Sequence, residues 1–250
     1  GSKVSIALSE KLGTKVNIGR IDLGFFNRII IDDMTIQDKQ KINMISAARL
    51  SAKFNIVALS QGKISISSIQ LFGFNGLFYK KDATTDANYQ FVLDSLASKD
   101  TTKSKPLDLK INSIIIRHGA LKYDRYDIPA LNNKFSLAHI NTYGISANIR
   151  LRTFTEDSLN LNIKKLAFKD QSGLSVNKLS LKLIADKKMA NLSDFVLNMP
   201  GSNIRIDNAN ATYRYNNKKL VPASLQFNVI LNNSKITPSD FKCFVPQLKS

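Results

Sequence analysis

The chain has 250 residues, with 36 Lys and Arg against 19 Asp and Glu, so its formal net charge is +17. It holds 27 Ile and only two Glu, and this composition disfavours an all-helical bundle because β-branched residues favour strands. A single cysteine, Cys243, excludes an intramolecular disulfide and any zinc site built from several cysteines. The charge makes an acidic partner plausible: nucleic acid, anionic lipid or an acidic polymer.

The N-terminal segment predicts a short amphipathic helix over residues 4–12. Val4, Leu8 and Leu12 share one helical face, and Gly13 suits the left-handed position that follows a helix. The two residues before this segment, Gly1-Ser2, are typical of a cloning remnant. We therefore expect that a natural N-terminus, with any targeting or anchoring segment, lies upstream.

Residues 15–80 change to a period of two, which indicates strands with one buried face. A second amphipathic helix is predicted over 86–97, where Tyr89, Val92 and Leu96 recur at helical spacing behind a possible N-cap at Asp86. The polar stretch 98–106 contains no apolar residue except Pro106 and is interpreted as a flexible linker or loop.

Period-two alternation returns from residue 107 to about 231 and predicts a long series of strands. Near the C-terminus, Thr237 is expected to cap a short helix over 238–244, with Pro238 in its first turn. An internal repeat of 45 residues links Ile69, Ile114, Leu159 and Ile204. Spacings of this size are typical of stacked units, although any alternating strand series offers similar coincidences.

No catalytic constellation is found in the sequence. The two histidines, His118 and His139, lack the partners of a metal site and are interpreted as polar residues on a sheet surface. Cys243 is expected to be a small buried hydrophobe, and the adjacent acids Asp32-Asp33 are expected to mark a strand end or turn. The sequence thus predicts a protein that is not an enzyme and that has no metal and no cofactor.

Three stretches resemble the TamB and AsmA-like proteins: the N-terminal run 8–38, the segment 60–71, and the stretch 197–204. The helix and linker at 86–106 are similar as well. The resemblance implies a mainly β chain, in which an elongated curved sheet forms an apolar trough, also called a β-groove or β-taco. Residues 1–250 would be a single β-rich periplasmic fragment of a longer protein anchored in the bacterial inner membrane by a missing N-terminal helix.

The resemblance also implies a function, the carriage of phospholipid between inner and outer membranes for outer-membrane biogenesis. An apolar groove retains acyl chains because each buried CH₂ contributes about 0.8 kcal/mol. Strand alternation predicts that the lipid-binding lining includes Ile114, Ile116, Leu159, Leu161, Ile163, Leu179, Leu181, Leu183, Ile204 and Ile206. The same residues could instead form a core closed by a second layer of the chain.

Two other functions remain open at the level of sequence. The chain could assist outer-membrane protein assembly by strand addition beside a β-barrel partner. Alternatively, its charge could serve nucleic-acid binding, but the basic residues are scattered along the polar positions of the strands and the aromatic residues are not interleaved with them. We therefore expect no nucleic-acid partner.

Overall fold

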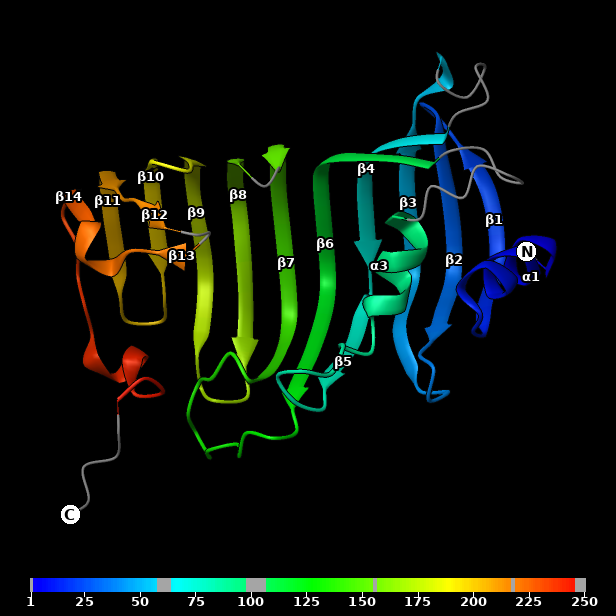
Figure 1. Cartoon of the computed structure of the whole chain (residues 1–250), viewed down its shortest axis with the longest axis horizontal. Helices are drawn as coiled ribbons and strands as arrows, with labels where there is room; N and C mark the ends of the chain where they lie inside the picture. Colours follow the sequence, from blue (N-terminus) through cyan, green and yellow to red (C-terminus); the bar gives the residue numbers. More distant parts are fainter. Residues whose placement is uncertain (1, 58–63, 98–106, 155–156, 217–218, 246–250) are drawn as a thin grey trace.

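The computed structural model describes residues 2–57, 64–97, 107–154, 157–216 and 219–245. Within these residues the protein is mainly β, and one large curved sheet of 12 strands forms most of it (Figure 1). The strands lie in the order β1-β2-β3-β4-β6-β7-β8-β9-β10-β11-β14, with β5 paired to β3 and β6. The fold class predicted from the sequence is therefore confirmed.

The N-terminal half of the chain contains α1 (Ser2–Leu12), β1 (Val16–Gly24), β2 (Arg28–Gln37), β3 (Asn43–Phe54), β4 (Ile64–Phe72), β5 (Asn75–Lys80) and α3 (Gln90–Ala97). The C-terminal half contains β6 (Leu107–Arg125), β7 (His139–Phe154), β8 (Ser158–Asp170), β9 (Ser175–Asp186), β10 (Met189–Asn198), β11 (Asn203–Thr212), the small pair β12 (Tyr215–Asn216) and β13 (Lys219–Leu220), and β14 (Gln226–Leu231). Two 3₁₀ helices span Pro222–Ser224 and Pro238–Phe241.

Neighbouring strands of the sheet are antiparallel, except where β4 and β5 run parallel to β6. Gly73 and Phe74 separate β4 from β5, and both strands pair with the same long strand β6. The stretch 73–76 is therefore a break within one strand direction and not a hairpin.

Two predicted helices differ from their expected form. The helix predicted over 86–97 begins only at Gln90. The Asn88 side chain explains the delay, because it accepts a hydrogen bond from the Tyr79 amide and donates one to the Leu77 carbonyl, which ties this segment to β5. The predicted C-terminal helix is a 3₁₀ helix, and Thr237 does not cap it, since its hydroxyl donates to the Gly201 carbonyl instead. The stretch 98–106 lies outside the described residues.

Several strands bend at residues that have positive φ angles. Asp33 in β2, Gly73 after β4, His118 in β6 and Gly144 in β7 have φ values of 55°, 61°, 53° and 60°. The Gly73 amide donates to the carbonyl of Arg117, so two of these bends lie side by side. Shifts in strand register accompany two of these residues, His118 and Gly144. Bulges of this kind bend a strand and increase its twist, which contributes to the curvature of the sheet.

The 45-residue spacing corresponds to paired positions of the sheet only from Ile69 to Ile114. Ile69 pairs with Ile114 in the parallel register of β4 and β6. Further along the sheet, however, Ile114 pairs with Ile149 of β7, which pairs with Ile163 of β8 and not with Leu159. The predicted series of equivalent positions therefore does not continue beyond β6.

Candidate functional site: an apolar trough

All ten residues predicted to line a groove lie on one face of the sheet. Directly paired residues of neighbouring strands point to the same side, so the register can be followed across the strands. One row joins Ile114, Ile149, Ile163 and Leu181. A second row joins Ile116, Ala147, Leu166, Leu179, Leu197 and Ile204. Leu161 and Leu183, Leu159 and Ala185, and Ile206 and Phe195 belong to parallel rows of the same face.

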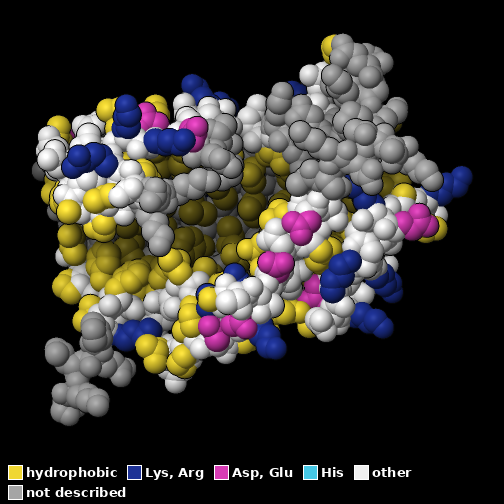
Figure 2. All heavy atoms as spheres, in the orientation of Figure 1, with side chains coloured by type: hydrophobic (Ala, Val, Ile, Leu, Met, Phe, Trp, Pro, Cys, Tyr) yellow, Lys and Arg dark blue, Asp and Glu magenta, His cyan; other side chains and the backbone are white. Residues whose placement is uncertain are grey.

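These ten side chains are half-buried, although a closed core would bury most of them fully. The accessible surface of the whole chain is 16672 Å², against about 11,000 Å² for a compact monomer of this mass. Figure 2 shows hydrophobic side chains gathered in a hollow of this face, over the middle and C-terminal strands. We call this concave apolar face the trough.

A hollow lies in the trough where β6, β7 and β8 change register. It has a volume of about 320 Å³ and is lined by Phe74, Ile116, Leu121, Phe135, Ile140, Thr142, Ile145, Ala147, Ile149, Leu166 and Phe168. Thr142 is the one residue of this lining with a polar side chain, and its hydroxyl already donates to the Leu121 carbonyl. The hollow therefore suits a part of a ligand that has no polar atoms.

Of the ten predicted residues, only Ile116 lines this hollow. The sequence analysis did not predict the other residues of its lining. The reason is a change of phase in each strand. Ile140 and Thr142 of β7 face the hollow, and so do Ile145 and Ala147, although the two pairs differ in parity. Gly144 lies between them with its positive φ angle. The glycine was the available signal, because an isolated Gly inside a strand pattern often marks a bulge.

Helices cover the trough at its β1 end. Leu12, Val16 and Ile18 form a buried cluster, against which Phe91 and Val92 of α3 pack. Figure 1 shows α3 lying across the concave face beside β3 and β5. Among the described residues, the chain itself occupies the trough at this end, whereas the predicted lining side chains on the strands from β6 onward are only half-buried.

One rim of the trough is reinforced by the C-terminal segment. Cys243 is buried together with Leu174, Val176 and Met199, and Phe135 packs against this cluster. The Asp240 carboxylate accepts hydrogen bonds from the Gly201 amide and the Ser202 hydroxyl, which fixes the 3₁₀ helix to the turn between β10 and β11. Burial raises the pKa of the Cys243 thiol, so it stays protonated and acts as the small buried hydrophobe predicted from the sequence.

His139 anchors the loop that carries Phe135, and this contact depends on pH. Its Nδ1 lies 2.9 Å from the Asp124 carboxylate, and its Nε2 faces the Ile128 carbonyl. The hydrogen bond to Asp124 raises the pKa of His139 above its usual 6.5. The stabilisation is complete below the ordinary value and is lost as the pH rises through the raised pKa.

We therefore expect the melting temperature to fall as the pH rises from 6.5 through the raised pKa of His139, because the imidazolium then loses its proton. His139→Gln should flatten this dependence, since an amide does not titrate. Circular dichroism melts of both proteins over this range measure the effect. Identical pH profiles for the two proteins would contradict it.

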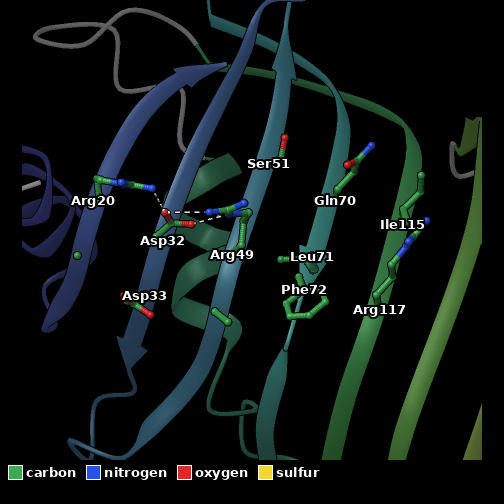
Figure 3. A pocket seen from close by; sticks show the side chains of 12 residues that line it. Arg20, Asp32, Asp33, Arg49, Ser51, Gln70, Leu71, Phe72, Ile115 and Arg117 are labelled. Carbon is green, nitrogen blue, oxygen red and sulfur yellow. Dashed lines mark hydrogen bonds and ion pairs between the residues drawn. The ribbon is translucent and has the colours of Figure 1, made fainter. Parts of the chain in front are cut away.

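The outer face carries a second hollow, of about 940 Å³, whose lining mixes charged side chains such as Arg20 and Arg117 with apolar ones such as Phe72 and Ile115 (Figure 3). Asp32 lines this hollow, and its carboxylate lies 2.6 Å from Arg49 Nε and 2.9 Å from Arg20 Nη2. The hydrogen bond from Arg49 lowers the pKa of Asp32, so the carboxylate is ionised and already neutralised. Asp32-Asp33 lie in the middle of β2, and the expectation of a strand end or turn was wrong; Asp33 has a positive φ angle there without a shift in strand register.

The remaining candidate residues take up structural positions. His118 is exposed, and its ring contacts Phe72 edge-on at 5.2 Å. In the part of the chain that the structure describes, no group of three or more His, Cys, Asp or Glu side chains could hold a metal ion. Within the same residues, no helix is both long enough and apolar enough to cross a membrane.

Comparison with known proteins gives no assignment. No family model matches the chain, and no curated protein matches it either. The class of protein is therefore defined by the architecture alone, as a mainly β chain with one concave apolar face.

Proposed function

We propose that the protein is a lipid-binding trough that holds phospholipid acyl chains along its concave face. The observation that carries the proposal is the apolar lining, in which rows of half-buried Ile and Leu cross the sheet and, in the part of the chain that the structure describes, no second sheet packs over them. A soluble protein seldom exposes an apolar surface of this size unless the surface has an occupant. Each methylene group that leaves water on this face contributes about 0.8 kcal/mol.

The lining supports movement along the trough as well as retention. In the hollow over β6, β7 and β8 the contacts are spread over many similar apolar side chains, and the one polar side chain, Thr142, already donates its hydroxyl to the Leu121 carbonyl, so nothing in this lining fixes a bound chain in one position. The net charge of +17 favours approach to an anionic membrane surface. Together with the resemblance to TamB and AsmA-like proteins, these features support a role as the first periplasmic segment of an inner-membrane-anchored lipid carrier.

Lipid mass spectrometry on the purified protein tests the proposal, with Leu161→Asp and Asn160→Asp as a matched pair. The two residues are neighbours in β8, so they point to opposite faces of the sheet. Leu161→Asp places a charge in the trough and should reduce co-purified phospholipid several-fold while the sheet stays folded. Asn160→Asp places the same charge on the outer face and should leave the lipid content unchanged.

The controls make each outcome decisive. Circular dichroism shows whether both variants keep the β-sheet, because unfolding of Leu161→Asp would indicate a closed core. Absence of phospholipid from the wild-type protein, after expression in cells that contain it, would overturn the proposal. Equal loss of lipid from both variants would also count against the trough as its location.

A further inference from the structure

The two edges of the large sheet differ in chemistry. At one edge, β1 carries the charged residues Arg20 and Asp22, and α1 packs against this strand through Leu12. At the other edge, β14 has the sequence Gln-Phe-Asn-Val-Ile-Leu, which contains no charged residue and no proline. All six of its residues are exposed. Natural sheets usually protect an edge with charges, proline, bulges or a covering element. Among the described residues β14 has no charge and no proline and all of it is exposed, and the register shift in its pairing with β11 lies on the β11 side, between Ile206 and Asn208.

The apolar rows of the trough stop abruptly at β14. Phe227, Val229 and Leu231 pair with Ala211, Ala209 and Ile206 of β11, so they continue the concave face. Their exposed fractions are 73%, 41% and 66%, whereas the residues they pair with are half-buried. What the three side chains lack is the neighbour that a further strand would supply.

The backbone of β14 identifies the kind of occupant. An edge strand presents a row of N–H and C=O groups, and these are satisfied in full only by another extended polypeptide. A lipid chain has no donors or acceptors for them. Because β14 is uncharged, a matching strand needs apolar residues on the trough side and no charge in the paired stretch.

We propose that the β14 edge binds an extended polypeptide segment with apolar side chains at alternate positions, which adds as a strand and lengthens the trough. The addition gives β14 a second neighbour, as every inner strand of the sheet already has. The proposal does not depend on lipid binding, since it is carried by the edge of the sheet and not by its concave face.

Hydrogen exchange of the whole chain tests the proposal with a defined probe. The probe is a short synthetic peptide that alternates valine and threonine between terminal lysines. We expect it to slow the exchange of amides in Gln226–Leu231 several-fold and to leave β1 unchanged. A control peptide with N-methylated valines keeps the side chains but loses backbone donors, and it should give no protection.

Two variants at one exposed position separate strand addition from loss of folding. Val229→Lys places a charge in the row that the peptide would extend and should abolish the protection. Val229→Thr keeps a β-branched residue without charge and should retain it. Both variants should keep the wild-type melting temperature, because Val229 is exposed.

Three results would overturn the proposal. One is equal protection by the N-methylated peptide, which would show that the contact is not a backbone ladder. Another is protection that survives Val229→Lys. The third is concentration-dependent protection of β14 without peptide, together with a dimer in sedimentation analysis that Val229→Lys dissociates, because the edge would then belong to a second copy of this chain.

Discussion

Asp38→Ala should lower the free energy of unfolding by about 3 kcal/mol, which is far more than an average surface substitution. Asp38 is 1% exposed. Two hydrogen bonds to its carboxylate close the turn between β2 and β3, and two others tie that turn to Tyr79 of β5 and to Asn88. One oxygen accepts from the amides of Gln40 and Ile42 at 2.8 and 3.0 Å. The other accepts from Tyr79 Oη at 2.7 Å and Asn88 Nδ2 at 3.2 Å.

The charge on Asp38 is part of this effect. Burial acts to raise the pKa of its carboxyl, but the hydrogen bonds from Ile42, Tyr79 and the other donors outweigh it and hold the pKa below its usual 3.8. Burial, assisted by the hydrogen bond to Asp38, raises the pKa of Tyr79 to about 12. The contribution of Asp38 is therefore present above pH 3.8 and is lost as the pH falls through the lowered pKa.

Denaturant unfolding at neutral pH measures the cost, with Asp22→Ala as the control. Asp22 is on the edge strand β1, and its carboxylate is 47% exposed, so its removal should change stability by less than about 0.5 kcal/mol. Asp38→Asn should fall between the two, because the amide keeps one acceptor oxygen but turns a donor toward Tyr79 or Asn88. Similar values for Asp38→Ala and Asp22→Ala would refute the account.

Asp170 repeats the arrangement of Asp38 at the turn between β8 and β9. In both turns the Asp amide donates to the carbonyl four residues ahead, at 2.8 Å, and a residue with positive φ, Lys41 or Gly173, follows at the third position. Asp170 is 4% exposed and accepts from the amide of Asn141 on β7. The sequence did not reveal these two acids, because an Asp in a hairpin usually lies in water, and here a third strand covers it.

Local alternation was enough to predict strands, their apolar residues and the shared face of short runs such as Leu159, Leu161 and Ile163. Local alternation could not predict whether two successive apolar runs of one strand lie on the same face of the sheet. Within β8 the concave face takes Ile163 and then Leu166, because the register shifts between them. A strict period of two places Leu166 on the opposite face, so alternation alone did not predict the lining of the hollow over β6, β7 and β8.

The same limit explains the 45-residue repeat. A constant spacing of 45 residues puts two residues side by side only while their strands keep one register, as β4 and β6 do from Ser68 to Phe72. Beyond β6, each bulge adds a residue to one strand and not to its neighbour, as between Ile116 and Gly119. The spacing of the apolar residues then no longer reports their position across the sheet.

Gly73→Ala should destabilise the protein by about 2 to 3 kcal/mol, whereas Gly144→Ala should cost about 1 kcal/mol. Both glycines have nearly the same backbone, with φ of 61° and 60°, so the strain of a side chain in the left-handed region is common to them. They differ in the room that is available for a side chain. A Cβ on Gly73 would lie 3.1 Å from Ala48 Cβ in the adjacent strand, and one on Gly144 would meet nothing within 4 Å.

Denaturant unfolding of the two variants separates strain from crowding. A further variant, Gly73→Asn, keeps the crowding but tolerates the left-handed backbone better, so it should lose less stability than a β-branched substitution at the same site. Equal losses of unfolding free energy for Gly73→Ala and Gly144→Ala would show that β3 shifts at Ala48 without a loss of stability. Because this close approach of strands occurs where the sheet bends, a larger cost at Gly73 would tie the curvature of the trough to packing at that bend and not to backbone conformation alone.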